Sequence, residues 1–235
     1  MLFDNFEEAY APQTLDDIVF QSETGKMVVE DAVSGLLGFP SCGINGILLY
    51  GVNGTGKSAL AKILPNLIEK AKGGDDAWQK NYNISTGGDN GARIIEAIKN
   101  QAMLMPVVAH YQYFVLDEVD NLRPDSMASL KVAMNINAKG TVFVFTTNRL
   151  SLIDKGVQDR CLRIEFNAAS GYAWLPRVKG ILKDYGVTGK SDDELLELIS
   201  HCRGSAREVM MAIKRVILAH LRKHQALDKR EIVSV

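Results

Sequence analysis

Short apolar runs and helical patterns alternate along the first two thirds of the chain. Runs typical of buried strands occupy residues 45–50, 82–85, 113–118, 141–148 and 162–166. Between them, the apolar spacing predicts helices at residues 57–64, 92–105 and 125–137, with Pro65 expected to kink or restart the first and Asp125 to cap the third. Strands that alternate with helices predict an α/β fold in which a mostly parallel, five-stranded sheet lies between helices.

The pattern changes after Phe166. Residues 171–184, 192–202 and 205–224 have helical periodicity, and no strand pattern separates them. This change predicts two domains: an α/β domain at residues 1–166 and a small helical domain at residues 167–235.

Composition and charge narrow the classes of function. The formal net charge is −1, so contact with nucleic acid would need a local basic surface. No apolar run is long enough to span a bilayer, and the N-terminus lacks the pattern of a signal peptide. The three scattered cysteines form no C-x-x-C pair, which argues against a zinc knuckle or a disulfide framework and makes the cytoplasm the expected location.

A glycine-rich segment, GVNGTGKS at residues 51–58, matches the pattern G-x-x-x-x-G-K-[ST] between a predicted strand and a predicted helix. In such a bend, backbone N–H groups surround phosphate oxygens, and the following helix directs its positive end at them. Lys57 is expected to reach the β- and γ-phosphates, and the Ser58 hydroxyl to bind Mg²⁺. The predicted nucleotide contacts here are Gly51, Val52, Asn53, Gly54, Thr55, Gly56, Lys57, Ser58 and Ala59.

Polar residues end two of the predicted strands. Asp117 and Glu118 end YFVLDE, where Asp117 is expected to hold Mg²⁺ and Glu118 to polarise a water for attack on the γ-phosphate. Asn148 ends the next strand, and its amide can hold that water or a phosphate oxygen without titrating. The alternatives are an acidic turn and a turn-forming Asn; Asp120 is expected to be a turn or cap residue.

Two arginines lie further along the chain. Arg160 follows a predicted short helix and is too far from its own phosphates, so it suits a neighbouring subunit's nucleotide. Arg207 begins a helix of the small domain and can fold over the γ-phosphate. For both, an ordinary surface arginine is the alternative, and Asp159 is placed to pin Arg160 in an idle position.

The order of these motifs resembles the AAA+ ATPases, and within them the small subunits of sliding-clamp loaders of the replication factor C and T4-like phage types. The similar segments are FEEAYAPQTLDDIVFQ (6–21), NISTGGDNGARIIEAIKN (83–100), LDEVDNLRPDSMASLKVAMN (116–135), TTNRLSLIDKGVQDRC (146–161) and CRGSAREVMMAIKRV (202–216). The resemblance implies a P-loop AAA+ domain followed by a helical lid, and hydrolysis of ATP to ADP with Mg²⁺.

The resemblance also implies roles for individual residues. Lys57, Glu118, Asn148 (the first sensor) and Arg160 (acting in trans) are the implied catalytic residues. Ser58 and Asp117 are the implied magnesium ligands, and Arg207 is the second sensor. The adenine is expected at Ile18 and Val19, beside Tyr10 and Pro12.

The implied function is an ATP-driven switch in DNA replication that assembles with other AAA+ subunits and acts on a partner such as a sliding clamp. Candidate DNA contacts are basic residues on the helices that flank the acidic strand, with an ordinary solvated surface as the alternative for each: Arg93, Lys99, Arg123 and Lys131. The chain departs from the family at Ala11, where the family has an arginine. It also stops about where the clamp-loader collar would begin, and this short length suggests a phage or mobile-element version. A helicase loader, a transposition regulator, another remodelling ATPase or a non-hydrolysing structural subunit are the alternatives.

Overall fold

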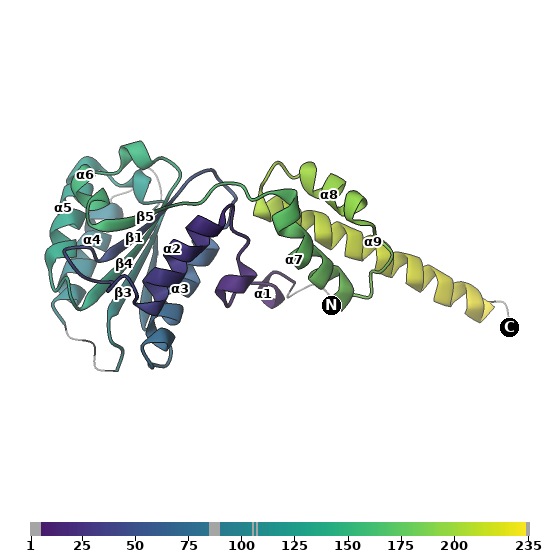
Figure 1. The fold of residues 1–235 in the computed structure, drawn as a ribbon, viewed down its shortest axis with the longest axis horizontal. Helices are drawn as coiled ribbons and strands as arrows, with labels where there is room; N and C mark the ends of the chain where they lie inside the picture. The colour runs from purple at the N-terminus through teal and green to yellow at the C-terminus, as the bar shows by residue number, and fades with distance from the viewer. Residues whose placement is uncertain (1–5, 85–89, 105, 107, 234–235) are drawn as a thin grey trace.

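A parallel five-stranded sheet forms the centre of the larger part of the molecule (Figure 1). The structure is a computed structural model, and it describes residues 6–84, 90–104, 106 and 108–233. The strand order is β2-β3-β4-β1-β5, and every pairing is parallel, which confirms the predicted α/β fold. The strands are β1 (Gly46–Tyr50), β2 (Gln79–Asn83), β3 (Gln112–Asp117), β4 (Thr141–Thr147) and β5 (Cys161–Glu165).

Helices cover both faces of the sheet because successive strand residues point to opposite faces. On one face, Ile47, Leu49 and Val144 pack with α2 (Glu23–Ser34) and α3 (Lys57–Ala71). On the other face, Leu48, Phe143 and Phe145 pack with α4 (Asn90–Ala102), α5 (Pro124–Asn135) and α6 (Lys155–Gln158). All residues of β4 are buried, so the strand runs through the middle of the core and ends directly before Asn148.

Three helices form a separate core beside the sheet: α7 (Gly171–Asp184), α8 (Asp192–Ser200) and α9 (Ala206–Val233). We call this unit the helical cluster; Figure 1 shows it alongside the α/β part, with α9 extending towards the C-terminus. Its buried residues include Trp174, Val178 and Ile213, together with Phe6 from the short helix α1 (Phe6–Ala9). The short helix α1 therefore packs on the helical cluster through Phe6, which the sequence pattern did not indicate.

Several element boundaries differ from the sequence predictions. The expected restart at Pro65 is wrong, because α3 continues through Pro65 to Ala71, where Leu60, Leu64 and Ile68 are all buried. Packing of this face outweighs the backbone hydrogen bond that proline removes. Asp125 is not the cap of α5: Arg123 is the N-cap, Pro124 takes the first helical position that proline favours, and Asp125 lies in the first turn.

Other differences concern element length. The strand expected at residues 82–85 begins earlier, at Gln79, and Ser85 lies outside the described residues, as does Met105 at the end of the predicted helix 92–105. The last helix continues beyond residue 224 to Val233. Among the described residues, no helix combines the length and the apolar character that crossing a membrane requires.

Candidate nucleotide-binding site

One cleft of about 860 Å³ runs from the carboxyl edge of the sheet to the helical cluster. Most of the residues proposed from the sequence line it. They are Tyr10, Pro12, Ile18, Val19, Asn53, Gly54, Thr55, Gly56, Lys57, Ser58, Ala59, Asp117, Glu118, Asn148 and Arg207. Gly51 and Val52 do not line this cleft, but both contact Lys57, and Arg160 does not line it either.

The phosphate loop (residues 51–58) needs its glycines. Gly51, Gly54 and Gly56 have φ values of 141°, 77° and 106°, in the region that side chains rarely adopt. A Cβ on Gly51 would lie 2.5 Å from Asn167 Oδ1. Gly56 caps α3 without a side-chain hydrogen bond, so the N–H groups at the start of this long helix are free to face an anion.

The end of β5 holds the phosphate loop in place. The Thr55 hydroxyl donates to the carbonyl oxygen of Phe166 at 2.9 Å, and the backbone N–H of Val52 donates to Asn167 Oδ1 at 3.1 Å. Asn167 belongs to the link between the α/β part and the helical cluster. The shape of the loop therefore depends on this link, which the glycine pattern alone does not reveal.

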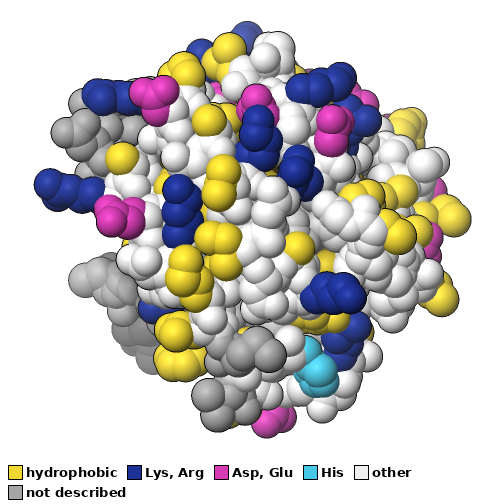
Figure 2. Space-filling view, turned by 90° about the vertical axis from the view of Figure 1, so that its left-hand side faces the viewer, with side chains coloured by type: hydrophobic (Ala, Val, Ile, Leu, Met, Phe, Trp, Pro, Cys, Tyr) yellow, Lys and Arg dark blue, Asp and Glu magenta, His cyan; other side chains and the backbone are white. Residues whose placement is uncertain are grey.

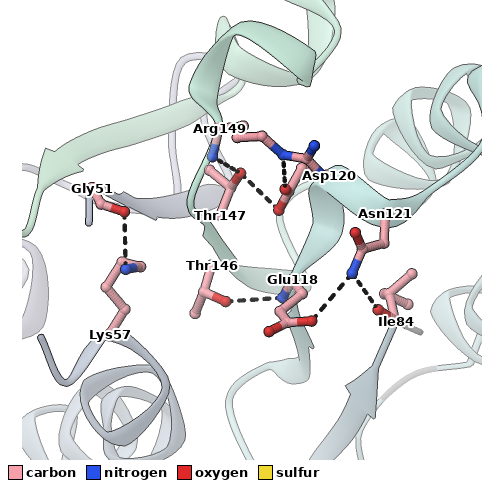
Figure 3. Close-up of polar contacts among 9 residues, drawn as sticks. All are labelled: Gly51, Lys57, Ile84, Glu118, Asp120, Asn121, Thr146, Thr147 and Arg149. Atoms are coloured by element: carbon pink, nitrogen blue, oxygen red, sulfur yellow. Dashed lines mark hydrogen bonds and ion pairs between the residues drawn. The ribbon is translucent and has the colours of Figure 1, made fainter. Parts of the chain in front are cut away.

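Lys57 is buried, and its ammonium group is held by backbone carbonyl oxygens. Its Nζ donates to Gly51 O at 3.1 Å, a contact drawn in Figure 3, and to Val52 O at 2.6 Å. Burial lowers the pKa of Lys57, although Asp117 and Asp120 oppose this change. An anion in the cleft would restore the solvation that the ammonium has lost.

Ser58 and Asp117 lie side by side on α3 and β3. The Ser58 hydroxyl donates to Asp117 Oδ1 at 2.8 Å, and Thr146 on β4 donates to the same oxygen. Thr146 Oγ1 also accepts from the backbone N–H of Glu118 at 3.0 Å, so it joins both acidic residues. A hydroxyl and a carboxylate in this arrangement offer the hard oxygen ligands that Mg²⁺ prefers.

The Glu118 carboxylate is held from the side of β2. Asn121 Nδ2 donates to Glu118 Oε2 at 3.1 Å and to the carbonyl oxygen of Ile84 at 2.9 Å (Figure 3). Glu118 itself has φ 57° and ψ 47°, a left-handed conformation that is uncommon for residues other than glycine. Such backbone conformations concentrate at functional sites, where the surrounding structure maintains them.

An ion pair joins the tips of β3 and β4 beside Asn148. Arg149 Nε donates to Asp120 Oδ2 at 2.9 Å, and the Thr147 hydroxyl donates to Asp120 Oδ1 at 2.9 Å. Asp120 lies in the 3₁₀ turn Val119–Asn121, as expected of a turn residue, and its side chain is only 4% exposed. Asn148 is exposed here and lines a second cavity of about 530 Å³ together with Val52, Asn53, Glu118, Asp120, Asn121 and Arg149.

The helical cluster touches the phosphate loop directly. The backbone N–H of Ala206, at the start of α9, donates to Gly54 O at 2.8 Å. A Cβ on Gly54 would lie 2.8 Å from Ser205 Oγ, so this approach also requires glycine. The contact brings the exposed Arg207 to the wall of the cleft.

The other end of the cleft is closed by contacts between the N-terminal segment (residues 10–19) and α7. Arg177 donates to Asp17 Oδ1 and to the carbonyl oxygen of Tyr10, both at 2.9 Å, and the Tyr10 hydroxyl donates to Asp184 Oδ2 at 3.0 Å. Burial opposes ionisation of Asp17, but hydrogen bonds from Gln13, Thr14 and Arg177 lower its pKa to about 2.

Some residues that line the cleft have no recognisable signal in the sequence. Arg177 and Trp174 line the cleft from within an ordinary helical pattern, and Thr146 lies inside a buried strand. No local motif distinguishes them, because each acts through contacts with distant segments of the chain. The other cleft residues without a predicted role are Ala11, Gln13, Asp17, Lys62, Ile63, Asn66, Ala206 and Met210, together with Glu7.

Two hydrogen bonds hold the Arg160 side chain, one to α5 and one to α6. Its Nε donates to Asn135 Oδ1 at 2.9 Å, and Nη1 donates to Gly156 O at 2.7 Å. The expectation that Asp159 pins Arg160 is not met: among the described residues, the contacts of Arg160 are with Asn135 and Gly156 and include no ion pair with Asp159.

The parallel sheet, the phosphate loop at its carboxyl edge and the adjoining helical cluster define the class of P-loop α/β folds. Residues 47–168 match the family described as "ATPase family associated with various cellular activities (AAA)". Because the match covers more than half of the sequence, the chain belongs to the AAA family.

Similar proteins agree with this assignment. Replication factor C small subunit 2 of Pyrobaculum islandicum is 29% identical over 210 residues, which cover 88% of this chain and 62% of that protein. Replication factor C small subunit of Methanosphaera stadtmanae is 27% identical over 208 residues, covering 86% and 59%. These relatives support the resemblance to clamp-loader small subunits, although the chain spans only 62% and 59% of their lengths.

A solved structure with lower sequence identity to this chain has a similar fold. The RuvB Holliday junction branch migration motor of Thermotoga maritima has a TM-score of 0.66 and 18% identity, covering 88% of this chain and 65% of that one.

Proposed function

We propose that this protein is a Mg²⁺-dependent ATPase of clamp-loader type. Binding and hydrolysis of ATP would drive the assembly or remodelling of a DNA-bound partner, such as a sliding clamp, in DNA replication. The observation that carries this proposal is the single cleft in which the phosphate loop, the Ser58–Asp117 pair, Glu118 and the start of α9 meet.

The phosphate end of the cleft has the groups that hydrolysis needs. Lys57 and the N–H groups of the phosphate loop bind the β- and γ-phosphates. Glu118 polarises the attacking water, and Asn148 holds that water or a γ-phosphate oxygen. Ser58 and Asp117 hold Mg²⁺, which when bound neutralises charge on the phosphates.

Residues 1–166 then act as the ATPase domain and residues 167–235 as the lid. Because Ala206 donates a hydrogen bond to the phosphate loop, a change at the phosphates is transmitted to α9 through a direct contact. Arg207, the next residue, contacts the γ-phosphate, so loss of that group alters how the lid is held. Tyr10, Pro12, Ile18 and Val19 enclose the adenine.

The proposed oligomer gives Arg160 a role between subunits. This side chain does not line its own cleft, so its proposed role is to stabilise the transition state in a neighbouring subunit. For this role it must exchange its contacts with Asn135 and Gly156 for a phosphate.

DNA contacts are proposed on the α4 and α5 side of the sheet. Figure 2 shows this side of the molecule, where lysine and arginine side chains are interspersed with carboxylates and apolar groups rather than gathered in one stripe. Lys131 is paired with Asp154 at 3.4 Å, which leaves less of its charge for a phosphate. Such a surface suits a few contacts to the DNA backbone, without reading of sequence.

An ATPase assay with the whole chain tests this function. We expect Mg²⁺-dependent turnover that rises when primed DNA and a sliding clamp are added together, and a ring that forms only with a non-hydrolysable ATP analogue. Stimulation by DNA with any other remodelled partner, but not with a clamp, would favour a helicase loader or a related ATPase. Binding of ATP without turnover under all conditions would favour a structural subunit.

A further inference from the structure

Asp120 carries a buried carboxylate that the proposed catalytic steps do not use. Its side chain is only 4% exposed, and Asp120 does not line the larger cleft, where Ser58 and Asp117 lie. A buried carboxylate is unfavourable unless hydrogen bonds and an opposite charge compensate for its lost hydration. Here the Thr147 hydroxyl donates to Oδ1 and Arg149 Nε donates to Oδ2, both at 2.9 Å, so each oxygen has its own donor.

These two donors lie on either side of Asn148. Thr147 is the last residue of β4, and Arg149 is the N-cap of the next 3₁₀ turn. The backbone N–H of Arg149 also donates to Thr147 Oγ1 at 3.0 Å, and Figure 3 shows the contacts that join Thr147, Arg149 and Asp120. Because the Asn148 side chain is exposed, the contacts of its two neighbours are what hold its backbone in place.

The same carboxylate is close to Glu118 along the chain, because Asp120 lies in the 3₁₀ turn that Glu118 caps. The backbone ladder between β3 and β4 pairs residues as far as Leu116 and Phe145. Past this point, side-chain contacts tie the two strand tips together, and those of Asp120 reach both neighbours of Asn148. The separation between Glu118 and Asn148, which line the same two cavities, therefore depends on Asp120.

We propose that Asp120 is a positioning residue for ATP hydrolysis, because it holds Asn148 in a fixed place relative to Glu118. This inference rests on the proposed function, in which Glu118 polarises the attacking water and Asn148 holds that water or a γ-phosphate oxygen. Asp120 acts through Thr147 and Arg149 and does not touch the nucleotide. A misplacement of about 1 Å in a site can cost about 100-fold in rate, so loosening Asn148 slows hydrolysis and leaves ATP binding in place.

Asp120→Asn separates an effect on the rate from an effect on binding. The amide keeps the size of the side chain and can still accept from Thr147, but it loses the ion pair with Arg149. We expect kcat to fall by about 10- to 100-fold and the affinity for ATP to stay within about twofold of wild type. Phosphate release measures the rate, and calorimetry measures the affinity. A loss of ATP affinity as large as the loss in kcat overturns the proposal, because Asp120 then shapes the whole site.

The same substitution in an Asn148→Ala background tests whether Asp120 acts through Asn148. If it does, Asp120→Asn changes the rate of hydrolysis by less than about twofold once Asn148 is alanine, because the two losses are not additive. Single-turnover measurements with an excess of protein give these slow rates. Equal losses in both backgrounds overturn the proposal, because a residue that only maintains the fold lowers the rate whether or not Asn148 is present.

Arg149→Met provides the same comparison if Asp120→Asn does not fold. The Arg149 side chain is 58% exposed, so its replacement should not disturb the core, and it should lower kcat only when Asn148 is present. Lys179→Met is the matched control, because Lys179 is the partly exposed partner of Asp192 in an ion pair at 2.6 Å within the helical cluster. Its kcat should equal that of the wild-type protein. Equal losses in Lys179→Met and Arg149→Met overturn the specific role of the pair at the strand tips.

The rate of the wild-type protein separates failure of this inference from failure of the proposed function. Absence of turnover in the wild-type protein overturns the proposed function, and the positioning role of Asp120 with it. Turnover in the wild-type protein, with equal losses on Asp120→Asn in both backgrounds, overturns the positioning role alone.

Discussion

The two ends of the cleft are built in different ways. At the phosphate end, eight consecutive residues form the loop, and its polar groups are linked by short hydrogen bonds, such as Ser58 to Asp117 at 2.8 Å. At the base end, the wall combines the N-terminal segment, α7 and α9, and the ring of Trp174 lies among apolar side chains. The phosphate end has a contiguous loop that polar contacts hold to β3 and to the end of β5, whereas the base end is built by packing between distant segments.

We therefore expect substitutions at the two ends of the cleft to have different effects. Changes at the phosphate end should alter turnover or metal binding and leave the fold intact. Changes at the base end should alter stability and nucleotide choice, because they loosen contacts between the helical cluster and the rest of the chain.

Glu118→Gln should abolish turnover and retain ATP binding. The amide keeps the size of the side chain and its contact with Asn121, but it cannot polarise a water, so we expect a loss of about 10²- to 10⁴-fold in kcat. Phosphate release measures the rate, and calorimetry measures binding. Normal turnover in this variant would mean that another group activates the water.

Thr146→Val should weaken magnesium binding. It removes the hydroxyl that donates to Asp117 and accepts from the Glu118 N–H, and the loss of such supporting contacts typically costs about 10- to 100-fold in metal affinity. The Mg²⁺ concentration for half-maximal ATPase activity measures this change. Thr147→Val is the matched control, because Thr147 contacts Asp120 rather than Asp117. Equal shifts in both variants would contradict a specific role for Thr146.

Asp17→Asn should destabilise the protein at neutral pH and have little effect in acid. The pKa of Asp17 falls from 3.8 to about 2 on folding, so its stabilisation is present above pH 3.8 and is lost as the pH falls towards 2. Because the side chain is 34% exposed, we expect a contribution of about 1 kcal/mol after allowance for screening by solvent.

Urea unfolding of the wild-type protein and Asp17→Asn at several pH values measures this contribution. The difference in unfolding free energy should shrink as the pH falls from 3.8 towards 2, following the titration of Asp17. Arg177→Met removes the partner of Asp17, so adding Asp17→Asn to this variant should change the unfolding free energy less than it does in the wild-type protein. A constant difference at all pH values would show that Asp17 acts only through its shape.

Asp159→Asn should have the smallest effect. In this structure Arg160 is held by Asn135 and Gly156, so the neighbouring carboxylate is a surface charge, and such groups contribute little, about 0–1 kcal/mol. We expect ATPase activity within about twofold of wild type in solution, with Asn135→Ala as the comparison that removes one of the two hydrogen bonds of Arg160. A large change in ATPase activity caused by Asp159→Asn alone would mean that Asp159 determines the position of Arg160.

The sequence pattern predicts the core of the fold well. Alternation of apolar runs and helical spacing gave five strands in a parallel sheet, because burial on both faces leaves a clear apolar signature in strands such as β4. Boundaries were less accurate where tertiary packing overrides a local signal. The passage of α3 through Pro65 is an example, since the buried face of the helix is what maintains it.

The sequence predicts the site mainly where its functional residues are neighbours in short motifs. The phosphate loop and the acids at the end of β3 are short motifs with a required spacing, and the resemblance to a known family supplied Ile18, Val19 and the second-sensor role of Arg207. Arg177 and Asp17 are 160 positions apart, and Val52 and Asn167 are 115 apart, so their pairing depends on the folded chain. The hydrogen bonds of Asn121 and the position of Trp174 in the cleft wall likewise become visible only in the folded structure.

Calorimetric titration of ATP with Mg²⁺ into the wild-type protein and into Lys57→Met tests the central claim most directly. If a triphosphate binds where the phosphate loop meets Asp117 and Glu118, the wild-type protein binds ATP at a single site, and loss of the buried ammonium weakens binding by at least about 100-fold, as for a desolvated charge pair. Absence of binding heat in the wild-type protein, or equal affinity in Lys57→Met, would contradict it.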